Sequence, residues 1–407
     1  MAQVTRRQFL TSSAATVLAA SVGSHVASAQ GKEIPMVGIW PFTGPFADVG
    51  PLLDRGMRFA IEEWGSKVIG RPIKYISRDS ETKAGAATRR VEEAIDSEGA
   101  KIVIGPWSSG VALAVTEVAK RRKALYFFSG GTEEIAGKRC HRYAFQWAAS
   151  PYTAMHVVMD KYMEQNPTHK KWYLFVSDYA FGWSVEKYLK VAGQRHKIEF
   201  LGADRAPLGT REWSGLVSKA ASAKPDVLCL LNAGQDVILS IREAHNFGLA
   251  PKVPIVIGWG VGTEDFVQLD AKTRENLWVG TNAYYTVNTP VARQYAEGYQ
   301  KKFGVPPGYA PNAGYAMTRL VLRGIEKARS AEPADIATAL EGWETEDWPG
   351  KLWINPKTHQ VVRDYFFIRC KKADQMKHPH DYADIVAASS RPLIADEFNE
   401  CKDIGTL

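Results

Sequence analysis

Residues 227–247, VLCLLNAGQDVILSIREAHNF, decide the fold class of this chain. The first five residues are all apolar, Gly234 lies in a short loop, and the last part places apolar residues at helical spacing. A strand that is apolar on both faces is typical of a parallel sheet covered by helices on both sides. The stretch therefore predicts one strand–loop–helix unit of an α/β protein.

The same alternation of strand-like and helix-like segments continues on both sides of this stretch. The strand-like segments are 34–41, 73–77, 101–105, 124–129, 172–177, 198–201, 227–231 and 253–257. The helix-like segments between them are 52–64, 84–98, 111–122, 184–194, 212–223 and 237–247. This alternation predicts parallel sheets with right-handed crossovers, and two series of four strands predict two doubly wound α/β lobes.

The later part of the chain mixes both kinds of segment and is expected to return to both lobes. The expected elements are a strand at 277–285, helices at 291–303, 312–327 and 334–340, and strands at 351–354 and 365–370. The lobes and tail are assigned as 30–149 with 282–357 for lobe 1, 150–281 with 358–395 for lobe 2, and 396–407 for a C-terminal tail. The polar stretch from Lys371 has few regular features and is expected to wrap over the surface.

Composition and charge are those of an ordinary globular protein. The chain has 407 residues, 45% of them hydrophobic and 23% charged, with a formal net charge of +7. Acidic residues accompany basic ones along the chain, as in Arg89-Arg90-Val91-Glu92-Glu93. Nucleic-acid-binding proteins concentrate Lys and Arg on one patch or tail, so we expect no nucleic acid partner. We also expect the protein to be monomeric.

The N-terminus has the features of a twin-arginine export signal. The motif Thr5-Arg6-Arg7-Gln8-Phe9-Leu10 precedes a weakly apolar run that closes with the small residues Ala27-Ser28-Ala29. The run is too short and too polar for a membrane span of ~20 apolar residues. We therefore expect residues 1–29 to be removed and the mature protein to be periplasmic.

Export makes the four cysteines candidates for disulfides. Cys229 lies inside an apolar strand and is interpreted as a buried free thiol. Cys401 lies in a tail that would fray unless it were tied down. We expect Cys401 to pair with Cys140, or next with Cys370, although the sequence allows three complete pairings.

Ligands of doubly wound sheets bind outside the carboxyl ends of the strands. The loops expected there are rich in Gly, Ser and aromatic residues, and comprise residues 40–45, 106–110, 129–132, 178–183, 232–235 and 258–262. Glycine and serine allow a ligand to approach backbone amides closely, and helix N-termini favour an anionic group.

At these loops the sequence resembles the leucine/isoleucine/valine-binding family of type I periplasmic binding proteins, from about Ile34 to about Asp381. The matching motifs are Thr43-Gly44-Pro45-Phe46 with Gly50 and Gly56, Ile102–Ser109, Ser129-Gly130-Gly131-Thr132, Ala180-Phe181-Gly182, Asn232-Ala233-Gly234 and Phe247-Gly248. Their order and spacing carry the resemblance. It implies two α/β lobes joined by three crossover segments, a cleft that closes on a ligand, and delivery to the membrane subunits of an ABC importer.

The resemblance also implies roles for individual residues. Ser108 or Ser109 and Thr132 match hydroxyls that hold a ligand carboxylate in the family, with the Gly130 carbonyl and the Thr132 amide completing the cradle. Phe181 stands where the family often has tyrosine, and Asn232 is expected on the opposite side of the ligand.

One departure from the family bears on the ligand. Amino-acid binders of the family place an acidic residue in the loop that matches Gly258-Trp259-Gly260, where it pairs with the ligand ammonium. This chain has tryptophan and glycine there. A buried ammonium without a carboxylate partner is costly, so an ordinary α-amino acid fits this loop poorly.

Tryptophans lie in four different strand-end loops, at Trp40, Trp107, Trp183 and Trp259. Their rings offer flat apolar faces, and we expect at least two of them to face the cleft. The favoured ligand is therefore an aromatic or bulky apolar carboxylate. The alternatives are a branched-chain amino acid, an amide or urea, or a ligand sensor of the same fold.

Other motifs were weighed as signs of catalysis or of cofactor binding. Residues 258–262 lack the glycine spacing of a dinucleotide loop, and residues 378–381 are interpreted as a solvated tail rather than a metal site. Ser108 and Ser109 lie outside any Gly-x-Ser-x-Gly motif. Asp48, Asp178 and Asp265 are interpreted as helix caps or loop carboxylates. We expect a protein that is not an enzyme and needs no cofactor or metal.

Overall fold

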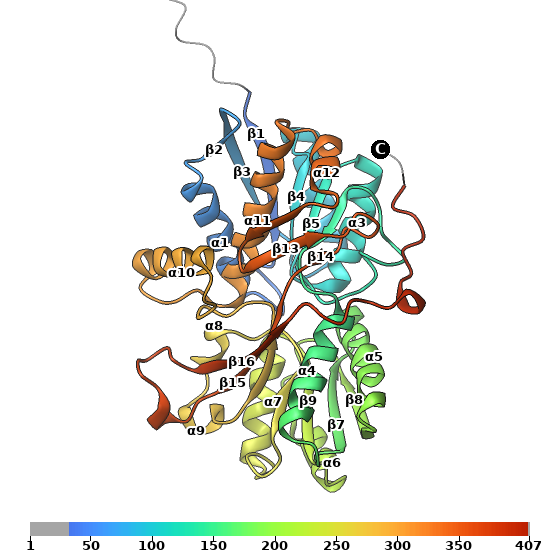
Figure 1. The fold of residues 1–407 in the computed structure, drawn as a ribbon, viewed down its shortest axis with the longest axis vertical. Helices are drawn as coiled ribbons and strands as arrows, with labels where there is room; N and C mark the ends of the chain where they lie inside the picture. Colours follow the sequence, from blue (N-terminus) through green and yellow to red (C-terminus); the bar gives the residue numbers. More distant parts are fainter. Residues whose placement is uncertain (1–31, 406–407) are drawn as a thin grey trace, which may run out of the picture.

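The computed structural model describes residues 32–405, and two sheets with helices on both faces form two lobes stacked along the long axis of the molecule (Figure 1). The predicted export signal, residues 1–29, lies outside the described residues. In the part of the chain from residue 32 to residue 405, no helix combines the length and apolarity that a membrane span requires.

Lobe 1 contains a six-stranded sheet in the order β2-β3-β1-β4-β5-β6, parallel except for β2 against β3. Its strands are β1 (Ile34–Trp40), β2 (Lys67–Val68), β3 (Arg71–Asp79), β4 (Ile102–Ile104), β5 (Leu125–Phe128) and β6 (Ala144–Gln146). Its helices are α1 (Gly50–Glu63), α2 (Ala84–Glu98), α3 (Ser109–Arg122), α10 (Pro290–Phe303), α11 (Tyr309–Ala328) and α12 (Pro333–Leu340). The last three helices return to lobe 1 after the chain has built most of lobe 2.

Lobe 2 contains a seven-stranded sheet in the order β16-β15-β11-β10-β9-β7-β8. Its strands are β7 (Lys171–Ser177), β8 (Glu199–Ala206), β9 (Val227–Leu231), β10 (Ile255–Ile257), β11 (Trp278–Thr281), β15 (Tyr365–Cys370) and β16 (Ala383–Ser389). Its helices are α4 (Pro151–Gln165), α5 (Ala180–Arg195), α6 (Ser214–Ser222), α7 (Gln235–Asn246), α8 (Thr263–Phe266) and α9 (Ala271–Arg274). Together the two sheets confirm the predicted two-lobed α/β fold.

The strand that decided the fold class, β9, lies inside the second sheet. All five of its residues are buried, and it pairs in parallel with β7 on one side and β10 on the other. The uninterrupted apolar run is therefore explained by helices on both faces of the sheet.

The return of α11 to lobe 1 depends on a close approach between two helices. A Cβ atom on Gly56 in α1 would lie 2.1 Å from the carbonyl oxygen of Pro311 in α11. A side chain at Gly56 would push the two helices apart, so glycine is required there.

The C-terminal region has more regular structure than the sequence indicated. Residues 371–395 were expected to be irregular, but β16 adds an antiparallel edge to the second sheet beside β15. Its residues alternate between shielded and exposed along the strand, so it lacks the continuous apolar run by which the inner strands were recognised. The expected strand at 351–354 is β13 (Gly350–Ile354), but its place in a small third sheet with β12 (Glu344–Asp347) and β14 (Val361–Val362) was not expected.

A disulfide joins Cys140, near the start of β6, to Cys401 in the C-terminal tail. Just before Cys401, Phe398 packs against Tyr152 and Tyr188 of lobe 2. The tail therefore contacts both lobes. Cys229 and Cys370 are buried free thiols.

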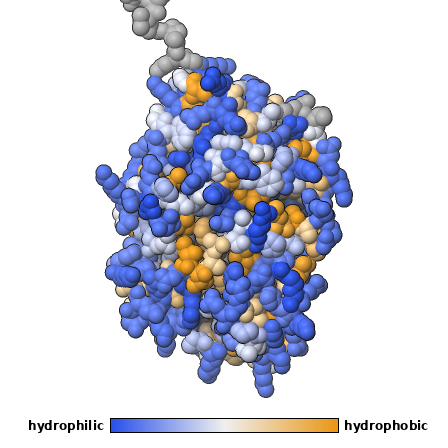
Figure 2. Space-filling model, viewed as in Figure 1, coloured by the Kyte–Doolittle hydropathy of each residue, from blue (hydrophilic) through white to orange (hydrophobic). Residues whose placement is uncertain are grey.

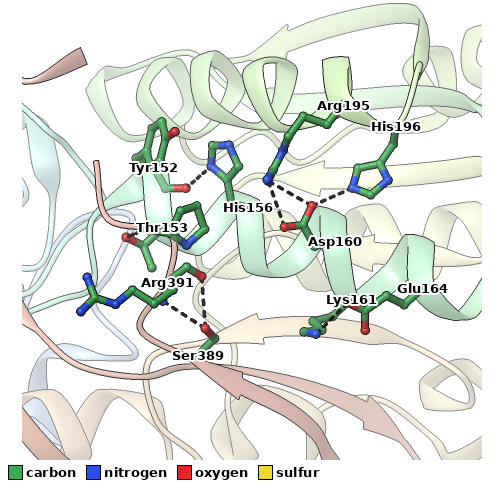
Figure 3. A network of polar contacts seen from close by, with 11 residues as sticks. Tyr152, Thr153, His156, Asp160, Lys161, Glu164, Arg195, His196, Ser389 and Arg391 are labelled. Atoms are coloured by element: carbon green, nitrogen blue, oxygen red, sulfur yellow. Dashed lines mark hydrogen bonds and ion pairs between the residues drawn. The ribbon is translucent and has the colours of Figure 1, made fainter. Parts of the chain in front are cut away.

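Polar contacts also tie α4 to its neighbours within lobe 2 (Figure 3). The Asp160 carboxylate accepts a hydrogen bond of 2.9 Å from Arg195 and lies 2.6 Å from Nε2 of His196, both at the end of α5. At the other end of α4, Thr153 Oγ1 donates to the carbonyl oxygen of Pro392 at 2.8 Å. These contacts join α4 to α5 and to the C-terminal segment within lobe 2.

Candidate ligand-binding site

Four helices begin beside a cavity between the two lobes. Ser109 and Tyr309 are the first residues of α3 and α11 in lobe 1, while Tyr179 and Gly234 precede the first residues of α5 and α7 in lobe 2. The cavity is lined by Trp107, Ser109, Ser129, Gly130, Gly131, Tyr179, Phe181, Ala233, Gly234, Trp259, Gly260 and Tyr309. Most of these residues lie in loops after parallel strands, where ligands of such folds bind.

Aromatic rings form the walls of the cavity. The rings of Trp107 and Tyr309 meet edge to face with centroids 5.2 Å apart, and those of Phe181 and Trp259 do so at 6.3 Å. Water-sized molecules fit in only about 30 Å³ of the cavity. The rings are therefore closed on each other, and a ligand larger than a few waters requires the lobes or the rings to move apart.

Direct contacts between the lobes hold this closed arrangement. Gln235 Nε2 of lobe 2 donates to Asp48 Oδ2 of lobe 1 at 2.8 Å, and Lys187 forms an ion pair with Glu133 at 3.3 Å. A Cβ atom on Gly234 would come within 2.9 Å of the Phe46 ring, so glycine permits the close approach of the lobes there.

The electrostatics of the cavity favour a negatively charged ligand. Among its lining residues, all within the described range 32–405, none is acidic. The N-termini of α3, α5 and α7 carry partial positive charge because their first amide groups have no partner within the helix. Ser129 Oγ is buried at the cavity with no hydrogen-bond partner among residues 32–405. An anionic oxygen would supply an acceptor for such groups.

The acidic residues closest in sequence to the loop Gly258-Trp259-Gly260 are Glu264 and Asp265, and both accept hydrogen bonds from backbone amides. Glu264 in α8 accepts hydrogen bonds from the backbone amides of Tyr309 at 2.8 Å and Ala310 at 2.6 Å, and thereby caps α11 across the lobe boundary. Burial raises the pKa of Glu264, and burial together with the nearby Glu264 charge raises the pKa of Asp265. Both Glu264 oxygens cap the backbone of α11, and Glu264 is not among the residues that line the cavity.

Half of the predicted site residues line the cavity. They are Trp107, Ser109, Gly130, Phe181 and Trp259. Each lies at the carboxyl end of a parallel strand or in the first turn of the helix that follows, which is where the sequence placed them.

The other five predicted site residues do not line this cavity. Trp40 is fully buried in lobe 1, where Nε1 donates to the Tyr75 hydroxyl at 2.9 Å. Trp183 is 53% exposed, and Nε1 donates to Asp178. Trp40 ends a strand with its ring directed into the core, whereas Trp183 in the first turn of α5 is largely exposed to solvent.

Three further polar residues do not line the cavity, and one of them, Thr132, contacts Ser184 in α5 of the other lobe. Ser108 is the residue before α3 and is buried. The Thr132 hydroxyl lies 3.4 Å from Ser184 Oγ, and is fully buried. Asn232 donates through Nδ2 to Ser240 Oγ at 3.3 Å and shapes the loop before α7.

The sequence interpretation did not single out several of the lining residues. The missed residues are Ser129, Gly131, Tyr179, Ala233, Gly234, Gly260 and Tyr309. All but Tyr309 lie within loops that were already identified. Tyr309 begins a helix that does not follow a strand directly, and the sequence feature that marks it is the breaker run Pro306-Pro307-Gly308 just before it.

Below the cavity, one buried arginine joins the three crossover segments between the lobes. Arg363 donates through Nε to the Trp147 carbonyl at 2.9 Å and through Nη1 to the Asn282 carbonyl at 2.7 Å. Its guanidinium also lies over the Trp147 ring, 3.8 Å from the centroid. Burial lowers the pKa of Arg363 to about 9, so the side chain remains charged at neutral pH. We call Trp147, Asn282 and Arg363 the crossover cluster.

Two larger hollows lie away from the loops that follow β4, β5, β7, β9 and β10. They have volumes of about 300 and 930 Å³ and are lined mainly by the third sheet and the C-terminal segment. On the face drawn in Figure 2, apolar residues gather across the middle of the molecule, where the lobes meet. Within residues 32–405, no cluster of three or more His, Cys, Asp or Glu side chains is arranged to hold a metal ion.

Comparison with known proteins identifies the family. A family model described as periplasmic binding protein matches residues 33–375. A Leu/Ile/Val-binding protein homolog 7 from Brucella abortus (strain 2308) is 26% identical over 355 residues, covering 82% of this chain and 86% of the relative.

Solved structures agree with this assignment. An amino acid ABC transporter substrate-binding protein from Pseudomonas fluorescens Pf-5 is 31% identical, with a TM-score of 0.86 over 91% of this chain and 98% of that one. A solute-binding protein from R. palustris in complex with benzoate is 18% identical, with a TM-score of 0.80 over 91% of this chain and 99% of that one, a likeness of fold alone. The chain belongs to the periplasmic binding protein family of ABC transporter substrate-binding proteins, whose members bind solutes and are not enzymes.

Proposed function

We propose that the protein captures an aromatic or bulky apolar carboxylate between its lobes and delivers it to the membrane subunits of an ABC importer. The observation that carries this proposal is the cavity itself. It has aromatic walls, no acidic lining residue within the described chain, and three helix N-termini beside it. Flat apolar rings suit an aromatic body, and helix N-termini suit an anionic end.

A ligand with an ammonium group is less suited to this cavity. A buried ammonium needs a carboxylate partner, because its desolvation is otherwise uncompensated. Glu264, the carboxylate closest in sequence to Trp259, is already used by the backbone of α11. The benzoate complex of the R. palustris protein supports the proposal, since a protein of the same fold holds an aromatic carboxylate.

Binding is proposed to act through closure of two lobes, with lobe 1 comprising residues 30–149 and 282–357 and lobe 2 residues 150–281 and 358–395. The open lobes expose both halves of the cavity, and a ligand that touches both favours the closed state. The mature protein is proposed to be a periplasmic monomer, exported through the twin-arginine signal in residues 1–29.

A branched-chain amino acid is the second candidate. The Pseudomonas fluorescens Pf-5 protein, described as an amino acid ABC transporter substrate-binding protein, favours it at 31% identity. An amide or urea ligand and a sensory role are further alternatives within the same fold.

A thermal-shift screen of mature protein, residues 30–407, tests the proposal. The panel contains aromatic carboxylates, branched-chain amino acids, keto acids, amides with urea, and quaternary amines. A ligand stabilises the protein by about 2.7 kcal/mol at a hundredfold excess over its dissociation constant. Stabilisation by aromatic carboxylates supports the proposal, whereas stabilisation by leucine or valine alone contradicts it.

A further inference from the structure

The hydroxyl group of Tyr309 has an unusual hydrogen-bonding arrangement. Its oxygen accepts one hydrogen bond from Trp259 Nε1 at 3.0 Å and another from Asn282 Nδ2, also at 3.0 Å. An indole N–H and an amide NH₂ can only donate. The Tyr309 proton therefore cannot be given to either neighbour and must be donated in another direction.

The orientation of the Asn282 amide is fixed by its other contacts. Its oxygen accepts hydrogen bonds from the Ala149 amide at 2.9 Å and from Arg363 Nη2 at 2.6 Å. Both partners are donors, so the oxygen must face them and the NH₂ group must face Tyr309. If the Asn282 amide were flipped, its NH₂ group would face the Ala149 amide and Arg363 Nη2, which are also donors.

The Tyr309 proton finds no acceptor within residues 32–405, although the side chain is 3% exposed and lines the cavity. Burial raises the pKa of Tyr309 to about 12, so the proton remains bound at neutral pH. A buried donor without an acceptor is costly, and the adjoining cavity is where a ligand oxygen would supply one.

The charge behind this hydroxyl favours a negatively charged acceptor. Arg363 is fully buried and donates to carbonyl and amide oxygens of Trp147, Asn282 and Asp364. No ion pair between Arg363 and a carboxylate occurs in the described part of the chain. Asn282 therefore connects the positively charged Arg363 to the Tyr309 hydroxyl through hydrogen bonds. A hydrogen bond from this hydroxyl to a charged oxygen is stronger than one to a neutral oxygen.

We propose that Tyr309 donates its hydroxyl hydrogen bond to an anionic oxygen of the ligand, and that Asn282 is the positioning residue that directs this proton into the cavity. Tyr309 thereby selects a carboxylate over an uncharged group of the same shape. This inference rests on the proposed function insofar as the cavity is the ligand site, but it applies to any carboxylate ligand, aromatic or aliphatic.

The first test is calorimetric titration of wild-type and Tyr309→Phe mature protein with benzoate, 4-hydroxybenzoate and leucine. The variant should bind the carboxylate that the wild type binds about 10- to 100-fold more weakly, the loss expected for a hydrogen bond to a charged group. Benzamide is titrated in parallel, and its affinity should fall less than that of benzoate.

Tyr315→Phe is the matched control. Tyr315 lies on the same helix, is buried, and donates its hydroxyl to Glu63 at 2.6 Å, away from the cavity. Carboxylate affinity should remain within about threefold of wild type. If Tyr309→Phe behaves like this control, the inference is overturned.

Asn282→Asp is a second variant that leaves Tyr309 in place. The new carboxylate oxygen would accept the Tyr309 proton and turn it away from the cavity, while the other oxygen keeps its contact with Arg363. Carboxylate affinity should therefore fall at least tenfold, although the two side chains have nearly the same shape. Unchanged affinity in Asn282→Asp would also overturn the inference.

The two proposals fail in different ways. If wild-type protein binds leucine and no aromatic carboxylate, the proposed aromatic ligand is wrong, and the Tyr309→Phe effect is then measured on leucine. A tenfold loss of leucine affinity still supports the role of Tyr309. Leucine affinity within threefold of wild type overturns it.

Discussion

The crossover cluster and the cavity are neighbouring regions that differ in the pairing of one central side chain in each, Arg363 and Tyr309. In the crossover cluster, Arg363 donates to oxygens from all three connections between the lobes. In the cavity, Ser129 Oγ and the Tyr309 proton lack partners within residues 32–405. The comparison indicates that Arg363 is paired without a ligand, whereas the Tyr309 proton in the closed cavity is not. Within residues 32–405, Nε1 of Trp147 also has no partner, so the contrast concerns these two side chains and not every polar group of the two regions.

The largest expected effect comes from breaking the crossover cluster. Arg363→Met removes hydrogen bonds to buried carbonyl oxygens and leaves those oxygens unpaired, so we expect the free energy of unfolding to fall by about 3 kcal/mol or more. Urea denaturation measures the loss. Arg89→Met, which alters an exposed ion pair with Glu93, should change the free energy of unfolding by less than about 0.5 kcal/mol. Equal losses in the two variants would contradict the assigned role of Arg363.

The proposed role of the cavity in ligand binding is tested by removing one aromatic side chain from its wall without changing the crossover cluster. Trp107→Ala should weaken binding of the aromatic carboxylate by about 2 kcal/mol, roughly thirtyfold, because the variant removes apolar surface from the proposed ligand cavity. Trp183→Ala removes the same kind of side chain from a position that is 53% exposed and does not line the cavity, and should leave the affinity nearly unchanged. Titration calorimetry on both variants decides whether the ligand binds in the cavity or beside the exposed Trp183 in α5.

A smaller effect is expected from an acidic side chain in the first turn of α7. Burial raises the pKa of Asp236 to about 6, and its carboxylate accepts from the Gly209 amide at 3.1 Å. A raised pKa in the folded state means that this group stabilises the fold when protonated and that the contribution is lost as the pH rises from about 4 to about 6.

Asp236→Asn removes this titration and retains an oxygen to accept from Gly209. Relative to wild type, the variant should gain about 1 kcal/mol in the free energy of unfolding between pH 4 and pH 7, a value reduced for solvent screening. Denaturation across this pH range measures the difference. A difference between variant and wild type that is constant over the range would contradict the prediction.

The sequence was sufficient for the fold because each strand–loop–helix unit carries its own pattern. The five apolar residues of β9 and the helical spacing of α7 required no distant information. The strand β16 was missed because its residues alternate in burial at the sheet edge, which resembles a polar loop when no partner strand is visible. The third sheet pairs strands that are neighbours in the sequence, but β12 and β14 have only four and two residues and carry too short a pattern to be recognised.

The site was only partly predictable, for geometric reasons. Trp107 and Trp259 line the cavity, but Trp40 faces the core and Trp183 faces solvent, since the direction of a side chain depends on strand pleat and helix phase. Tyr309 could be placed only with the tertiary structure, because its neighbours Trp259 and Asn282 lie 50 and 27 residues away in the sequence.

Titration calorimetry of mature wild-type protein with benzoate, benzamide, benzylamine and leucine tests the central claim most directly. These compounds separate an anionic from a neutral and a cationic end on one aromatic body, with an amino acid as the fourth case. We predict that benzoate binds, that benzamide binds more weakly, and that benzylamine and leucine show no measurable binding. Tight binding of leucine together with no binding of benzoate would contradict the account.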